Sequence, residues 1–117
     1  MRIITGSARG TKLETLAGEE TRPTIERVKE AVFSMIQFDI EGRRVLDLFG
    51  GSGQMGLEAL SRGAQVCTLV DNNPDAVAII KRNAQKTHLY EKCRVISTDW
   101  NLFLRGTKEQ YDIVFLD

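Results

Sequence analysis

The sequence predicts a doubly wound α/β fold built on a mostly parallel sheet. From residue 43 onward, strand-like and helix-like segments alternate, and the strand-like segments are almost entirely apolar. Such strands are typical of parallel sheets that are covered on both faces, and right-handed crossovers then place helices on the two sides. The chain has 117 residues, 42% of them hydrophobic and 27% charged, which suits one domain with a single core.

Composition narrows the classes of function. Sixteen basic and sixteen acidic residues cancel, so a nucleic-acid partner would have to be met by a local patch. Cys67 and Cys93 lie apart, with one histidine in the chain, which predicts buried free thiols and no metal site. Neither a signal peptide nor an apolar run of about 18 residues is present, so we expect a cytoplasmic protein without a membrane partner.

Residues 1–20 are predicted to form a separate basic hairpin, or a pair of short strands around glycines. Arg2, Arg9 and Lys12 precede the first acid, Glu14. These cations favour contact with an anionic partner, although an ordinary solvated hairpin surface is equally compatible with the pattern.

A helix is expected within residues 21–37, with Thr24 as its N-cap and Glu26 in its first turn. Thr21 and Arg22 stand just before the helix, where an anion could bind, or where an ordinary cap and loop could lie. The apolar positions that predict its core-facing stripe are Ile25, Val28, Val32, Met35 and Ile36.

The remaining elements follow in order. We expect strands at residues 43–49, 64–71, 93–98 and 111–117, and helices at residues 53–63, 72–87 and 101–106. Gly63 is predicted to end its helix in the left-handed conformation. Asn73 is the expected cap of the next helix, with Pro74 in the first turn.

A glycine loop follows the first of these strands. Gly51, Gly53 and Gly56 spell the G-x-G-x-x-G pattern of dinucleotide binding, but Asp47 lies close before them. At an effective dielectric constant near 20, a carboxylate about 5 Å from a phosphate charge opposes it by roughly 3 kcal/mol. The same carboxylate attracts the sulfonium and ammonium groups of S-adenosylmethionine, so the loop favours that cofactor over NAD.

Acidic residues recur at the strand ends, where ligands of such sheets bind. These residues are Asp47, Asp71, Asp99 and Asp117. Asp71 can accept hydrogen bonds from ribose hydroxyls in either cofactor class. Asp99 could accept a hydrogen bond from an adenine amine beside an apolar wall at Trp100. A solvated residue at the end of a strand is an equally good interpretation of Asp99.

Several motifs together carry a family resemblance. "VLDLFGGSG", "LVD" and "DIVFLD" resemble motifs of class I S-adenosylmethionine-dependent methyltransferases, which have a Rossmann-like sheet. "MRIITGSARGTKL", "TRPTIERVKEAVFSMI" and "GLEALSRGA" resemble the RsmD-type family of 16S ribosomal RNA guanine-N2 methyltransferases. The resemblance extends over essentially the whole chain.

The resemblance implies methyl transfer from S-adenosylmethionine to the exocyclic amine of a guanine, with ribosomal RNA or the small-subunit particle as partner. It assigns cofactor contacts to Asp47, Phe49, Gly51, Gly53, Asp71, Asn72, Asp99 and Trp100. It assigns RNA contacts to Arg2, Arg9, Lys12, Thr21, Arg22 and Thr24. Asp117 matches the first residue of the catalytic D-P-P-Y motif, whose carboxylate would hydrogen-bond the target amine.

The chain departs from that family at its end, because the prolines and tyrosine of D-P-P-Y and the later strands do not follow Asp117. We therefore expect an N-terminal portion of a longer protein, in which residues 21–117 form an incomplete cofactor-binding domain. Its fourth strand would be an exposed edge prone to pairing. We expect the cofactor site to be largely kept and methyl transfer to be weak or absent.

Other functions stay open at this stage. A methyltransferase of DNA, protein or a small molecule could use the same motifs. The literal glycine spacing alone favours an NAD-dependent oxidoreductase, and a non-catalytic RNA-binding or assembly module would not need the absent motif residues.

Overall fold

A four-stranded parallel sheet forms the centre of the molecule. The structure is a computed structural model that describes residues 1–17 and 23–116. The strands are β1 (Arg44–Asp47), β2 (Val66–Asp71), β3 (Cys93–Ser97) and β4 (Ile113–Phe115), in the order β3-β2-β1-β4. The doubly wound sheet is confirmed, with β4 at one edge as expected. The winding reverses between β1 and β4, which makes that crevice the place to look for a ligand.

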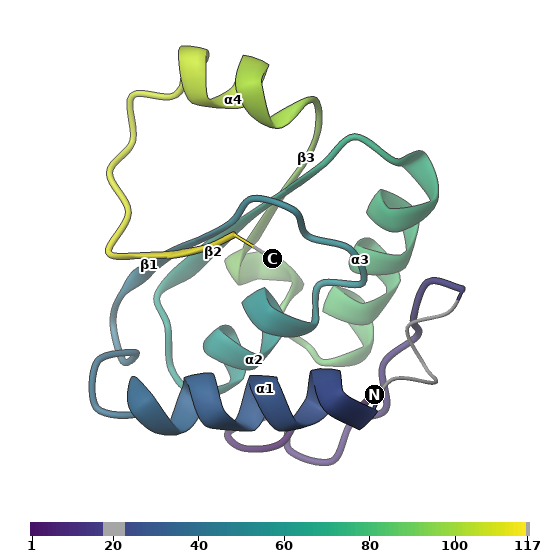
Figure 1. Cartoon of the computed structure of the whole chain (residues 1–117), viewed down its shortest axis with the longest axis vertical. Coiled ribbons are helices and arrows are strands. Elements are labelled where there is room, and N and C mark those ends of the chain that lie inside the picture. The colour runs from purple at the N-terminus through teal and green to yellow at the C-terminus, as the bar shows by residue number, and fades with distance from the viewer. Residues whose placement is uncertain (18–22, 117) are drawn as a thin grey trace.

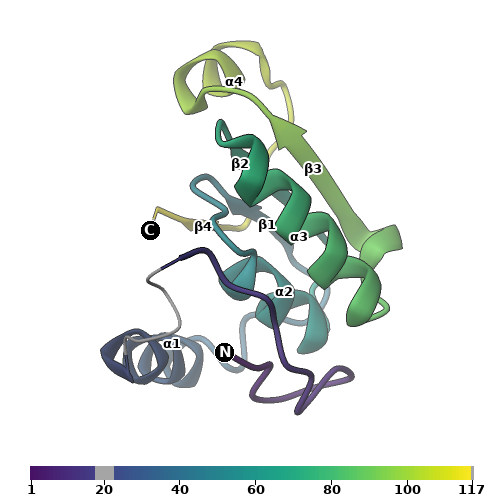
Figure 2. The same cartoon turned by 90° about the vertical axis from the view of Figure 1, so that its right-hand side faces the viewer.

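Helices cover both faces of the sheet. They are α1 (Pro23–Met35), α2 (Gln54–Ser61), α3 (Pro74–Lys86) and α4 (Trp100–Gly106), with a 3-10 turn, η2 (Tyr90–Lys92). Helices α1, α2 and α3 lie on one side and α4 on the other (Figures 1 and 2). The larger cluster of buried apolar side chains includes Leu57 of α2 and Ile80 of α3. The smaller cluster joins β1 and β2 to Phe103 of α4.

Local chemistry sets the helix ends in the α2–α3 region. Asn73 is the N-cap of α3, because its side-chain oxygen accepts a hydrogen bond from the backbone N–H of Asp75 at 2.9 Å, and Pro74 is the first helical residue. After α2, Gly63 adopts φ +106°, a conformation that L residues with a Cβ rarely reach. All three expectations are confirmed.

The start of α1 corrects one expectation. The helix begins at Pro23, so Thr24 lies inside its first turn and the prediction that Thr24 is the N-cap was wrong. Proline suits the first helical position because its missing N–H has no partner within the helix there.

The buried face of α1 also differs from the predicted stripe. Val28 is 60% exposed and Met35 is 82% exposed, whereas Phe33 is fully buried. Phe33 packs against Phe115 of β4, with ring centroids 5.6 Å apart. This contact rotates α1 away from the face that apolar spacing alone favoured, although Val32 and Ile36 do pack against the core.

The N-terminal segment (residues 1–14) pairs with itself and joins the core. Arg2 and Lys12 form an isolated antiparallel bridge, and the N–H of Ile3 donates to the carbonyl of Thr11 at 2.9 Å. The pairing is one isolated bridge, and among the described residues of this segment no strand is assigned, so the predicted short strands are not formed. Ile3 and Leu13 belong to the larger core cluster. The domain boundary predicted after residue 20 lies outside the described residues.

A buried carboxylate, Glu58 of α2, anchors this segment. Its oxygens accept hydrogen bonds from the N–H groups of Ile4 at 2.8 Å and Thr5 at 3.1 Å. They also pair with Lys29 of α1 at 3.2 Å and Arg62 at 2.9 Å. Three parts of the chain that are distant in sequence are thus held at one point.

Candidate functional site

Two adjoining cavities lie at the carboxyl ends of β1 and β2. The loop cavity, of about 230 Å³, is lined by Asp47, Phe49, Gly50, Gly51, Ser52, Gln54 and Met55. The aromatic cavity, of about 40 Å³, is lined by Leu48, Phe49, Asp71, Asn72, Thr98 and Trp100. Phe49 contributes to both, so one elongated ligand could occupy them together. The structure therefore gathers six of the eight predicted cofactor residues along one path, and Gly53 follows the loop cavity as the N-cap of α2.

The two predicted carboxylates hold the glycine loop in shape. Asp71 accepts a hydrogen bond from the N–H of Gly51 at 2.9 Å through one oxygen, and from Asn73 at 2.9 Å through the other. Asp47, which is 1% exposed, accepts from the N–H of Gly56 at 3.1 Å. Both acids stand beside the ligand path.

Other loop N–H groups are also occupied by the protein. Gly50 donates to the carbonyl of Val70 at 2.9 Å, and Gly53 donates to the carbonyl of Gly50 at 2.7 Å. Gly53 adopts φ +84° at the N-cap of α2, where a residue with a Cβ would be strained. A loop that cradles phosphate presents free N–H groups to it. The N–H groups of four glycines already donate to protein oxygens: Gly50, Gly51, Gly53 and Gly56. This loop is therefore poorly suited to a pyrophosphate.

The negative field of Asp47 extends into the core. Burial raises the pKa of the Cys67 thiol well above its ordinary value, and the nearby Asp47 charge raises it further. Burial likewise raises the pKa of Cys93 to about 12. Both cysteines are free, as predicted, but only Cys67 is fully buried; Cys93, at the start of the edge strand β3, is partly exposed, so the prediction that both are buried was wrong for Cys93.

Two polar side chains of the loop cavity were not singled out from the sequence. Ser52 is 1% exposed and Gln54 is 6% exposed. The Ser52 Oγ and Gln54 Oε1 atoms are buried and have no hydrogen-bond partner among the described residues. Their position inside the glycine motif was a signal that polar groups stood at the loop, but only packing reveals that they are enclosed.

The aromatic cavity has flat walls. Phe49 is 42% exposed and Trp100 is 46% exposed, and their ring centroids lie 6.4 Å apart. Thr98, which the sequence interpretation did not select, adds a polar residue to this lining. Apolar walls next to the Asp71 carboxylate suit a nucleoside, because a base can pack on the rings while hydroxyls donate to the acid.

Asp99 has a different observed role. One of its carboxylate oxygens accepts from the N–H of Asn101 at 3.1 Å and caps α4, and Asp99 is not among the residues that line the two cavities. Its contact with an adenine amine stays a prediction. Thr21, Arg22 and Asp117 lie outside the described residues, as does the side chain of Thr24.

The predicted RNA-contacting cations lie on the N-terminal segment. Arg2, Arg9 and Lys12 are exposed, and the bridge between Arg2 and Lys12 places these two side chains on the same side of the paired segment. They are therefore available to an anionic partner.

Asn83 of α3 connects this segment to the glycine loop. Its fully buried amide donates to the carbonyls of Glu14 at 2.8 Å and Ser52 at 2.9 Å, and its oxygen accepts from the N–H of Glu14 at 2.9 Å. The amide thus fixes the backbone of both the segment and the loop. No local pattern of residues indicated this role.

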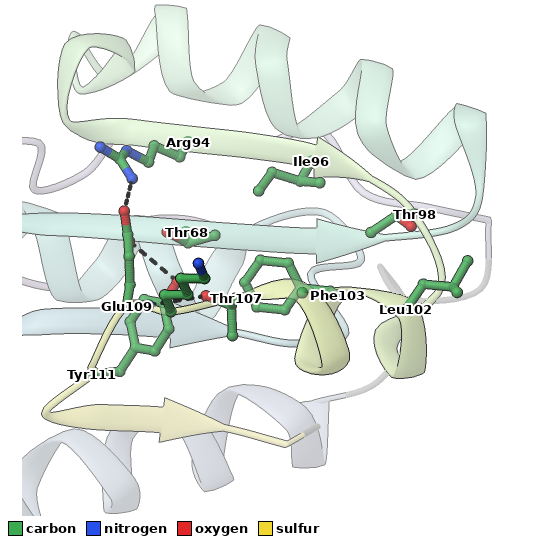
Figure 3. A pocket seen from close by; sticks show the side chains of 11 residues that line it. Thr68, Arg94, Ile96, Thr98, Leu102, Phe103, Thr107, Glu109 and Tyr111 are labelled. Carbon is green, nitrogen blue, oxygen red and sulfur yellow. Dashed lines mark hydrogen bonds and ion pairs between the residues drawn. The ribbon is translucent and has the colours of Figure 1, made fainter.

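A larger cavity, of about 440 Å³, lies between the sheet and α4 on the opposite face (Figure 3). Ile96, Phe103 and Tyr111 supply much of its apolar wall, while Arg94 and Glu109 pair with each other across it. Because Arg94 and Glu109 pair with each other, their charges are less available to a ligand than the carboxylates at the strand ends. Within the described ranges no cluster of metal-binding side chains occurs, and no helix is long and apolar enough to span a membrane.

Comparison with known proteins identifies the family. The family described as conserved hypothetical protein 95 matches residues 1–117. The chain belongs to this family. The predicted resemblance to the RsmD family is thereby confirmed. Ribosomal RNA small subunit methyltransferase D of Haemophilus influenzae is 39% identical over 120 residues, which include 100% of this chain and 62% of that protein.

Solved structures agree with this assignment. The yhhF protein of Escherichia coli has a TM-score of 0.89 at 36% identity, covering 99% of this chain and 62% of that one. An S-adenosylmethionine-dependent methyltransferase from Agrobacterium tumefaciens has a TM-score of 0.64 at 28% identity, covering 80% of this chain and 31% of that one. The Rossmann-like methyltransferase fold is confirmed. This RsmD family chain spans less than two thirds of the relatives that it matches.

Proposed function

We propose that this chain is the cofactor-binding portion of an S-adenosylmethionine-dependent methyltransferase. The proposal rests on the hydrogen bonds that the N–H groups of the glycine loop make. Its N–H groups at Gly51 and Gly56 donate to Asp71 and Asp47, so the loop offers carboxylates to its ligand. A cationic cofactor suits that arrangement and a pyrophosphate does not.

The enclosed residues suit the parts of this cofactor. Asp47 and the loop cavity would hold the positively charged methionine end, and Asp71 would accept from the ribose hydroxyls. Phe49 and Trp100 would pack against the base, with Asn72 at the rim of the same cavity. When bound, the cofactor supplies an electrophilic methyl group on a sulfonium. The chain's own contribution is to orient this group and exclude water around it.

We further propose a guanine of small-subunit ribosomal RNA as the methyl acceptor, at its exocyclic N2 amine. The support is the family and the printed name of the Haemophilus influenzae relative. The cations of the N-terminal segment would contact the RNA backbone, and Thr21, Arg22 and Thr24 would lie beside the target base. Such a base has to leave its stack to be reached.

Asp117 is the proposed catalytic residue. Its carboxylate would accept a hydrogen bond from the target amine and direct the nitrogen lone pair. It comes two positions after the last residue of β4, which pairs with β1 beside the glycine loop. A ribosomal RNA substrate implies a cytoplasmic location. We propose that the chain binds the cofactor through the residues that line the two cavities.

Calorimetric titration of this chain with S-adenosylmethionine and, separately, with NAD tests the proposal. We expect binding of the first ligand alone, with an affinity that falls about 10- to 100-fold in Asp71→Ala, the range for loss of a hydrogen bond to a charged group. Asp75→Ala, at an exposed acid of α3, is the matched control and should bind as the parent chain does. Binding of NAD alone would refute the methyltransferase assignment.

A further inference from the structure

A row of cations extends from the N-terminal segment onto α3. Leu13 is buried between the exposed Lys12 and Glu14, which is the alternation of extended backbone, so Lys12 and Glu14 share the outer side. Arg2 pairs with Lys12 across the bridge and lies on that side too. The Glu14 carboxylate then meets the Arg82 guanidinium of α3 at 2.7 Å. The outer side of the segment therefore continues onto one flank of α3.

Lys86 lengthens this row by one helical turn. It follows Arg82 by four residues, the spacing that puts two side chains on the same helix flank about 5–6 Å apart. Both side chains are exposed. Asn83, next to Arg82, is buried, and its amide binds the backbone of Glu14 and the carbonyl of Ser52. The cations therefore stand on backbone that is fixed to the glycine loop.

We propose that the cationic strip, defined as Arg2, Lys12, Arg82 and Lys86, binds the sugar-phosphate backbone of the RNA substrate, so that α3 takes part in RNA binding. This inference rests on the proposed function. Two extended residues span about 7 Å and a helical turn about 5 Å, both shorter than the Debye length of about 10 Å at 0.1 M salt. The fields of neighbouring cations therefore add, which suits a regular polyanion.

The pairing of Glu14 with Arg82 gives the strip a feature that can be tested. Their side chains are 49% and 56% exposed, so the pair contributes little to stability. A phosphate of bound RNA would compete with the Glu14 carboxylate for the guanidinium. Removing this carboxylate frees Arg82 and takes a negative charge away from the strip, so it should strengthen RNA binding. Asp75, about two turns before Arg82 on the same flank, bounds the strip on that side.

The test measures fluorescence anisotropy of a labelled single-stranded RNA of mixed sequence, titrated with the 117-residue chain at several salt concentrations. We expect Lys86→Gln and Arg82→Gln each to reduce the slope of log K against log salt concentration by about 0.7, the value for one phosphate contact on a single strand. Over a tenfold range of salt concentration, that change corresponds to about a fivefold difference in affinity. Glu14→Gln should change the affinity by a similar factor in the opposite direction.

Lys81→Gln is the matched control for net charge. Lys81 is also an exposed lysine of α3, but it lies about 140° around the helix from Lys86, away from the N-terminal segment. It should leave the salt slope unchanged. Equal effects of Lys81→Gln and Lys86→Gln, or weaker RNA binding by Glu14→Gln, overturn the inference.

Two further outcomes concern the partner itself. The inference is also overturned if the parent chain does not bind the RNA, or if it binds phosphatidylserine vesicles more tightly than the RNA. Calorimetric titration of the same variants with S-adenosylhomocysteine should give the affinity of the parent chain. A chain that binds RNA through the strip but not this ligand would contradict the proposed cofactor site and leave the strip in place.

Discussion

Replacing Glu58 by glutamine tests whether one buried charge cluster holds the N-terminal segment on the fold. Glu58 is 0% exposed and Lys29 is 1% exposed, and their charged groups lie 3.2 Å apart. The Lys29 ammonium also donates to the carbonyl of Arg2 at 3.2 Å. In Glu58→Gln the ammonium keeps its burial and loses its counter-charge.

The size of the effect follows from that burial. Removing one partner of a buried ion pair costs about 3–5 kcal/mol, because the other charge stays desolvated. The free energy of unfolding of such a domain is about 5–15 kcal/mol, so the variant should lose a large fraction of its stability. Lys29→Met in the Glu58→Gln background removes the stranded charge, and should recover about 2 kcal/mol or more.

The pH dependence has a definite sign. Burial lowers the pKa of Lys29 from its ordinary 10.5, while the charge of Glu58 and its hydrogen bond raise it. Without Glu58 the folded-state pKa falls further, so the unfolded chain binds more protons than the folded chain at pH values between the folded pKa and 10.5. Stability then rises with pH across that window. The loss in Glu58→Gln should therefore be largest below the folded-state pKa of Lys29 and should shrink as the pH rises toward 10.5.

Urea denaturation at several pH values measures these free energies, and hydrogen exchange at the N–H groups of Ile4 and Thr5 reports whether the segment detaches. Glu30→Gln, at an exposed acid of α1, should change stability by no more than about 0.5 kcal/mol. The reasoning is refuted if Glu58→Gln costs less than about 1 kcal/mol, or if its cost does not depend on pH.

Two further predictions concern the packing behind the site. In Gly56→Ala a Cβ would stand 2.7 Å from the Cys67 Sγ and 2.9 Å from the Leu69 Cδ2. Overpacking costs about 1–3 kcal/mol, whereas the higher helix propensity of alanine stabilises by about 1 kcal/mol. We therefore expect the free energy of unfolding to fall by about 1 kcal/mol, measured by thermal unfolding. A higher Tm would contradict this. Since burial raises the pKa of Cys67 well above its ordinary value and that of Cys93 to about 12, neither should react with a disulfide reagent at pH 8 until the chain unfolds. Rapid labelling of the native chain would argue against that environment.

The order of the elements and their ends were largely readable from the sequence. Apolar runs marked the strands, and Asn73, Pro74 and Gly63 marked helix boundaries. These features depend on residues within a few positions of one another, so local patterns were sufficient. Asp47 and Asp71 were likewise placed at the glycine loop, because parallel strands bring their carboxyl ends to one edge.

The buried face of α1 could not be predicted from local sequence patterns in the same way. Apolar spacing favoured the side with Val28 and Met35, yet the buried side carries Phe33 and a lysine, Lys29. A sequence pattern counts lysine as a surface residue, since burying its charge is unfavourable without a partner. That partner, Glu58, is supplied by another helix 29 residues further along the chain.

The sequence by itself determined the alternating fold, the family and the acids that flank the glycine loop. Tertiary structure alone decided which polar side chains are enclosed. The bonds from Glu58 to Ile4 and from Asn83 to Glu14 join residues 54 and 69 positions apart, and the unpartnered oxygens of Ser52 and Gln54 are defined only by what surrounds them. Burial and hydrogen-bond satisfaction are properties of the packed chain, so no local pattern of residues could have contained them.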